Sequence, residues 1–118
     1  MTNPLQFMEE SRQGVTILHI LDQRLIDPQL SEQLTRRLCG FIEGGCMRLL
    51  IEMGAVNRIS SVFFRSFIAA GKKAKERNAQ MAFCNLTPLI KEGFTITGLD
   101  KLFKIYASEG QAIGEIGE

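Results

Sequence analysis

The sequence contains no tryptophan and has only one histidine, one tyrosine, three prolines and three cysteines. Histidine and cysteine, which commonly act as metal ligands, bases and nucleophiles, are therefore scarce. Cys39, Cys46 and Cys84 are odd in number and show neither a C-x-x-C motif nor a zinc-binding spacing. We therefore expect free thiols, as in a protein of the reducing cytoplasm.

Long apolar runs and an excess of one charge are also missing. The longest apolar segments have the length of a strand, so we expect no membrane insertion. Residues 1–4 lack the basic and apolar regions of a signal peptide. The 14 basic and 13 acidic residues nearly cancel, which gives no positive surplus for binding nucleic acid. The 118 residues are predicted to form a single cytoplasmic domain, 1–118.

Motifs typical of enzymes are absent too. The chain has no G-x-S-x-G, no phosphate-binding glycine loop and no G-x-G-x-x-G after a strand; Gly44 and Gly45 end a helix instead. His19 lies inside a predicted strand, where a hydrogen-bonded structural role is the better interpretation than a base or ligand. Helix capping accounts for Asp27 and loop solvation for Asp22. We expect no catalytic site, no cofactor and no metal, and hence a protein that is not an enzyme.

The apolar pattern alternates between strands and helices. Strands are predicted over residues 5–12, 15–21, 47–53, 79–84 and 102–106. Helices are predicted to begin at Asp27-Pro28, Ser60-Ser61, Thr87-Pro88 and Ser108-Glu109. The resulting order, β-β-α-β-α-β-α-β-α, predicts an α/β domain with a mostly parallel mixed sheet and packed helices.

Two adjacent serines, Ser60 and Ser61, lie where the central strand's loop ends and a helix begins. The unpaired N–H groups and the helix dipole make such a first turn favourable for a negative group. One hydroxyl is expected either to cap the helix, which stabilises it by about 1 kcal/mol, or to be the place where charge arrives. The helix is amphipathic, with Phe63, Phe67, Ala70 and Ala74 on its apolar face. The residues expected on its exposed side are Val62, Arg65, Ser66, Ala69, Lys72 and Lys73.

Three segments of the chain resemble motifs of one known family. Residues 21–25 (L-D-Q-R-L) resemble its L-x-G-R-L-D turn, and residues 56–64 (V-N-R-I-S-S-V-F-F) resemble V-D-F-I-D-S-S-G-L. Residues 97–105 (T-G-L-D-K-L-F-K-I) resemble the T-G-L-D-x-L-F-x-I that leads into a last strand. The family is that of the STAS domains, in particular the bacterial anti-sigma factor antagonists. The resemblance extends from about Val15 to Ile113 and implies a STAS-like fold.

The resemblance also implies a function. In the family, a serine at the start of this helix accepts phosphate from a cognate serine kinase, which is itself an anti-sigma factor. The unphosphorylated antagonist binds that kinase and so frees the sigma factor. By alignment Ser61 holds the phosphoacceptor position, and Ser60, the second choice, replaces the preceding aspartate. Phe63 and Arg65 stand where the family has glycines, and they are expected to change the surface that a kinase contacts.

Two hypotheses of different classes follow. The first is an anti-sigma factor antagonist-like module that binds an anti-sigma serine kinase, or a related regulatory protein, and is switched by phosphorylation. The second is a constitutive STAS scaffolding subunit of a transporter or another multiprotein complex. A third, weaker alternative is binding of a nucleotide or another small ligand. The residues expected to contact the partner are Arg24, Asp27, Ser60, Ser61, Val62, Arg65 and Ser66.

Overall fold

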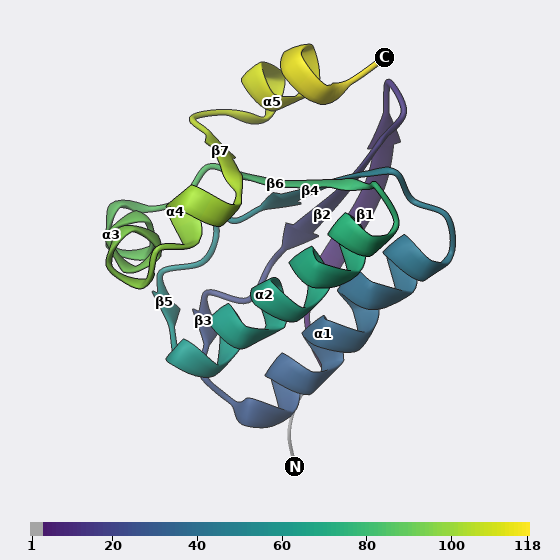
Figure 1. The fold of residues 1–118 in the computed structure, drawn as a ribbon. Coiled ribbons are helices and arrows are strands. Elements are labelled where there is room, and N and C mark those ends of the chain that lie inside the picture. The colour runs from purple at the N-terminus through teal and green to yellow at the C-terminus, as the bar shows by residue number, and fades with distance from the viewer. Residues whose placement is uncertain (1–3) are drawn as a thin grey trace.

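A computed structural model describes residues 4–118 (Figure 1). Its main sheet has five strands in the order β1-β2-β4-β6-β7, in which β1 is antiparallel to β2 and all other neighbours are parallel. The strands are β1 (Phe7–Arg12), β2 (Val15–Ile20), β4 (Arg48–Glu52), β6 (Gln80–Cys84) and β7 (Lys104–Tyr106). The predicted alternation of elements and the mostly parallel α/β sheet are confirmed.

Helices lie on both sides of this sheet. Figure 1 shows α1 and α2 packed side by side on one side of it and α5 on the other. The helices are α1 (Pro28–Glu43), α2 (Ser61–Glu76), α3 (Pro88–Thr97), α4 (Leu99–Leu102) and α5 (Glu109–Ile116). Side-chain caps begin two of these helices. Asp27 accepts a hydrogen bond from the Gln29 N–H at 2.8 Å at the start of α1, and Ser108 accepts one from the Gln111 N–H at 3.1 Å at the start of α5. None of the helices within residues 4–118 has the length and apolar character needed to cross a membrane.

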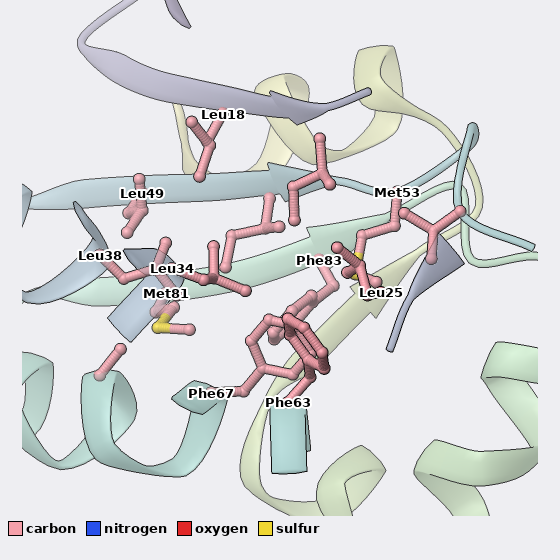
Figure 2. Close-up of a cluster of buried hydrophobic side chains, with 14 of the residues drawn as sticks. Leu18, Leu25, Leu34, Leu38, Leu49, Met53, Phe63, Phe67, Met81 and Phe83 are labelled. Atoms are coloured by element: carbon pink, nitrogen blue, oxygen red, sulfur yellow. The ribbon is translucent and has the colours of Figure 1, made fainter. Parts of the chain in front are cut away.

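The larger hydrophobic core lies between the sheet and the helices α1 and α2 (Figure 2). Its centre is aromatic: the Phe67 and Phe83 rings meet edge to face at 4.9 Å, and Phe83 meets Phe94 at 5.0 Å. Each such pair adds roughly 0.5–1.5 kcal/mol beyond the burial of its apolar area. The opposite face of the sheet has a smaller core, in which α5 covers Val15, Ile17 and Leu50.

Three short elements differ from the sequence prediction. A separate two-stranded parallel sheet joins β3 (Arg24–Leu25) to β5 (Arg58–Ile59). The strand predicted over residues 102–106 begins only at Lys104, so its first two residues were assigned wrongly. Leu102 ends the helical turn of α4, and Phe103 follows it with its ring against Phe83 at 5.2 Å.

Candidate functional site

The small β3–β5 sheet brings together two of the three segments that resemble family motifs. Its pairing is continued by the backbone: the Asn57 N–H donates to the Gln23 carbonyl at 2.7 Å, and the Ser60 N–H donates to the Leu25 carbonyl at 2.8 Å. Leu25 itself is fully buried in the larger core. The loop after β3 and the start of α2 therefore form one surface.

The two serines at the start of α2 differ in their surroundings. Ser60 occupies the N-cap position with extended backbone, but its side chain makes no capping hydrogen bond. Its hydroxyl instead donates to the Ile26 carbonyl at 3.4 Å, across the two loops. Ser61 is the first residue of α2 and is exposed. Ser61 is therefore open to solvent, and the Ser60 side chain does not cap the helix beside it.

Arg24 and Asp27 lie on the neighbouring loop. The backbone of Arg24 pairs with Arg58 in the β3–β5 sheet, while its exposed side chain makes no hydrogen bond within residues 4–118. Asp27 is half-buried and caps α1 through the Gln29 N–H, as the sequence predicted. Asp27 thus has a structural role, whereas Arg24 presents its charge to solvent.

The prediction that Ser66 lies on the exposed side of α2 is wrong. Ser66 is only 3% exposed, and its hydroxyl donates to the Ser31 carbonyl of α1 at 3.1 Å. The reason is that α1 packs against the side of α2 that carries Ser66. Ser66 is therefore buried, in addition to the residues on the apolar face that meets the sheet. Val62 and Arg65 remain at the mouth of a shallow groove of about 470 Å³ between the two helices. They stay candidates for contact with a partner.

A second expectation also fails at this helix. Phe63 is fully buried and points into the larger core (Figure 2). It therefore cannot change the surface that a kinase contacts, although it stands where the family has glycine. Of the two glycine replacements only Arg65 is exposed, one helical turn after Ser61. Arg24 and Arg58, register partners in the small sheet, are also exposed.

The fold and the placement of these motifs define the class of protein. The family model of the STAS domain matches residues 6–112, and the chain belongs to this family. Among curated proteins it is 26% identical over 90 residues to BtrV of Bordetella bronchiseptica, whose name gives it a proposed role as an anti-sigma factor antagonist. That match covers 76% of this chain and 78% of BtrV.

Solved structures share the fold. An anti-sigma factor antagonist from Mycobacterium paratuberculosis superposes with a TM-score of 0.83 at 20% identity, covering 95% of this chain and 93% of that one. The Bacillus cell fate determinant SpoIIAA in its phosphorylated form gives a TM-score of 0.73 at 15% identity, covering 94% and 99%. This chain therefore has the fold of anti-sigma factor antagonists.

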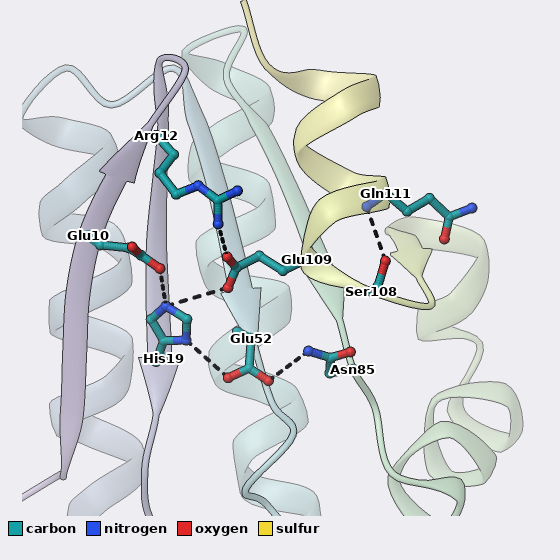
Figure 3. Close-up of polar contacts among 8 residues, drawn as sticks. All are labelled: Glu10, Arg12, His19, Glu52, Asn85, Ser108, Glu109 and Gln111. Atoms are coloured by element: carbon teal, nitrogen blue, oxygen red, sulfur yellow. Dashed lines mark hydrogen bonds and ion pairs between the residues drawn. The ribbon is translucent and has the colours of Figure 1, made fainter.

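Sequence reasoning did not find a second polar cluster, on the α5 side of the sheet (Figure 3). His19 Nε2 lies 2.6 Å from Glu10 Oε1 and 3.6 Å from Glu109 Oε1, and His19 Nδ1 lies 3.1 Å from Glu52 Oε1. Arg12 pairs with the other oxygen of Glu109. These groups come from β1, β2, β4 and the start of α5. These side chains meet only because their strands pair in one particular register. The sequence pattern alone does not give that register.

The pKa values in this cluster are shifted in opposite directions. Burial by itself lowers the pKa of His19, but its hydrogen bonds with Glu10 and Glu52 and the negative charges of Glu109 and Glu52 outweigh this and raise it. Burial by itself raises the pKa of Glu52, but bonds from His19, the Gly54 N–H and Asn85 outweigh it and lower the pKa. Both shifts favour the form in which a protonated His19 is paired with ionised carboxylates.

Proposed function

We propose that this chain is a phosphorylation-switched antagonist that binds an anti-sigma serine kinase, with Ser61 as the residue that receives the phosphoryl group. The observation that carries the proposal is the exposed Ser61 hydroxyl in the first turn of α2. The backbone bonds between Gln23 and Asn57 and between Leu25 and Ser60 fix that turn beside the other family motif. Membership of the STAS family and the likeness to BtrV support it.

The switch follows from the chemistry of this first turn. The Ser61 hydroxyl oxygen attacks the γ-phosphorus of ATP held by the kinase; ADP leaves, and the hydroxyl proton passes to a base of the kinase. The phosphate brings nearly two negative charges to a surface that had docked as a neutral hydroxyl. At a helix N-terminus this charge is tolerated by α2 itself, so the effect falls on the interface.

Arg65 has a particular part in this proposal. It lies four residues after Ser61, which places the two side chains on neighbouring positions of the same helix face. A guanidinium there pairs well with phosphate oxygens. In the unphosphorylated state the same exposed Arg65, with Arg24 and Val62, is available to contact the kinase. Phosphorylation would then both add charge and withdraw Arg65 from the partner.

The partner-switching cycle would operate in the cytoplasm, where the kinase and ATP are present, and would act on transcription through the released sigma factor. The alternative of a constitutive scaffold would use the same surface without any phosphate chemistry. The switch and the scaffold are distinguished by one property: only in the switch does a phosphoryl group on Ser61 change the affinity for the partner.

The test is phosphorylation and binding with the serine kinase encoded nearest to this gene. Intact mass after incubation with the kinase and ATP should show one added phosphoryl group in wild type and in Ser60→Ala, and none in Ser61→Ala. Ser61→Asp should bind the kinase at least tenfold more weakly, while Ser61→Ala binds as wild type does. If Ser61→Asp binds with wild-type affinity, the switch is disproved and the scaffold is favoured.

A further inference from the structure

We propose that Glu10, His19 and Glu109 form a binding site for a divalent transition-metal ion of the zinc class. The site lies on the α5 side of the sheet (Figure 3), away from the groove between α1 and α2, and it is independent of the proposed switch at Ser61. It departs from the expectation, drawn from the sequence, that the chain holds no metal ion.

The three candidate ligand atoms already lie close together. One ligand atom from each of the three residues lies within 4.8 Å of the other two. His19 Nε2 is 2.6 Å from Glu10 Oε1 and 3.6 Å from Glu109 Oε1. Two ligands bonded to tetrahedral Zn²⁺ at ~2.1 Å lie about 3.4 Å apart, a separation that these two distances bracket. Small rotations of the two carboxylates would complete three corners of a tetrahedron.

The orientation of the imidazole is fixed by a group outside the three ligands. His19 Nδ1 faces Glu52 Oε1 at 3.1 Å, which leaves Nε2 directed at Glu10 and Glu109. Glu52 is itself held by the Gly54 N–H at 2.6 Å and by the Asn85 side-chain amide at 3.1 Å. A carboxylate that accepts the second ring N–H is the usual support of a metal-bound histidine, because it sets the tautomer and makes the ligand nitrogen more basic.

The charges also match a divalent ion. With His19 neutral, the carboxylates of Glu10, Glu52 and Glu109 carry three negative charges, and Arg12 offsets one of them through the second oxygen of Glu109. A cation with two positive charges would neutralise the remainder.

The ion can reach this position from solvent. The side chain of Glu10 is 38% exposed, and those of His19 and Glu109 are 16% and 21% exposed. The three ligands come from β1, β2 and the start of α5, so a bound ion would join the N-terminal hairpin to the last helix. Water would occupy the fourth coordination position.

The test is titration of untagged, metal-free protein with ZnCl₂, followed by calorimetry, and with CoCl₂, followed by visible absorption. The background is Cys39→Ser with Cys46→Ser, because these half-buried thiols would otherwise compete. We expect a single site and a tetrahedral Co²⁺ spectrum. Zinc should also raise the thermal unfolding temperature.

Variants locate the site. His19→Ala should abolish saturable binding, the partly exposed Glu10→Gln should weaken it at least tenfold without unfolding the protein, and Glu52→Gln should weaken it about 10- to 100-fold. Glu76→Gln, on the exposed side of α2, is the matched control and should bind as the background does. Absence of saturable binding, or binding that Glu10→Gln and His19→Ala leave unchanged, would overturn the proposal.

Discussion

At the scale of single residues, the start of α2 has three serines that differ in what a partner can reach. Ser61 is exposed, the Ser60 hydroxyl is turned towards the Ile26 carbonyl, and Ser66 is buried against α1. The same side-chain chemistry therefore serves three purposes within two helical turns. Only Ser61 combines exposure with a position at the positive end of the helix.

The contrast between Ser66 and Ser61 predicts different effects on stability. Ser66→Ala removes a buried hydrogen bond to Ser31 and should lower the free energy of unfolding by about 1 kcal/mol. Ser61→Ala removes an exposed hydroxyl that caps nothing and should change it by less than about 0.5 kcal/mol. Urea denaturation of both variants is the measurement, and equal effects would contradict the difference in burial.

His19 predicts a dependence of stability on pH. Its pKa is raised above the ordinary value of 6.5, so the stability it contributes is fully present below pH 6.5 and is lost as pH rises through the folded-state pKa. The pKa of Glu52 is lowered from 4.5, so its contribution is lost only as pH falls through that lower value. Wild type should therefore exceed His19→Gln in stability by about 1–2 kcal/mol near pH 6 and by less near pH 9.

Denaturation in EDTA at several pH values between these limits measures that difference. The chelator keeps a bound metal from contributing. A difference between wild type and His19→Gln that stays constant with pH would mean that the imidazolium is not paired in the folded state.

At the scale of elements, two glycines in helices predict opposite outcomes. A methyl group at Gly71 of α2 would lie 2.6 Å from the Phe103 ring, whereas nothing lies within 4 Å of a methyl group at Gly40 of α1. Gly40→Ala should stabilise the protein by about 0.5–1 kcal/mol, since alanine favours a helix. Gly71→Ala should instead destabilise it by roughly 1–2 kcal/mol, because Phe103 must leave its place against Phe83.

Thermal unfolding of the two alanine variants side by side tests this pair. Equal stabilisation by both would show that Phe103 moves aside without cost. Near-ultraviolet spectra of Gly71→Ala would report a change in aromatic packing directly.

The sequence predicted the elements that have a long local pattern and missed those that depend on pairing with a distant segment. The helices from Asp27-Pro28 and Ser60-Ser61 were predictable because their apolar residues recur at helical spacing over many residues, and Asp27 also caps α1. The two-residue strands β3 and β5 were not, because they exist only through pairing between segments more than 30 residues apart. The last strand was predicted to begin at Leu102, two residues too early. An apolar run does not show where a helical turn ends and a strand begins.

The candidate site was also predictable only in part. The alignment of motifs placed Ser61 at a helix start, and the structure agrees with that position. The helix pattern failed for Ser66, since only the packing of α1 reveals a second buried line. The carboxylate partners of His19 lie at positions 10, 52 and 109, and no local pattern connects them.

At the scale of the whole molecule, the sheet is covered unequally. The larger core is covered by α1 and α2 together, whereas α5 is the main cover of the face that holds Val15, Ile17 and Leu50. Ile113 of α5 is 3% exposed in this smaller core, while Ile96 of α3 is 76% exposed. Ile113→Ala should cost about 2–4 kcal/mol of unfolding free energy. Ile96→Ala, its matched control, should cost less than about 0.5 kcal/mol.

Chemical denaturation of both isoleucine variants measures the importance of this last helix. If Ile113→Ala is as mild as Ile96→Ala, α5 is dispensable for the fold, and its removal should then leave a folded chain.

The order of the strands in the main sheet is also their order along the chain, from β1 and β2 through β4 and β6 to β7. Each new strand of the main sheet therefore pairs with the strand of that sheet made just before it. A nascent chain leaving the ribosome can begin with the N-terminal hairpin and extend the sheet by one strand after each helix, without waiting for a distant segment. The face that α5 covers must remain open until α5 itself has been made, after all five strands of the main sheet, so that face is exposed to aggregation for longer than the face beneath α1 and α2.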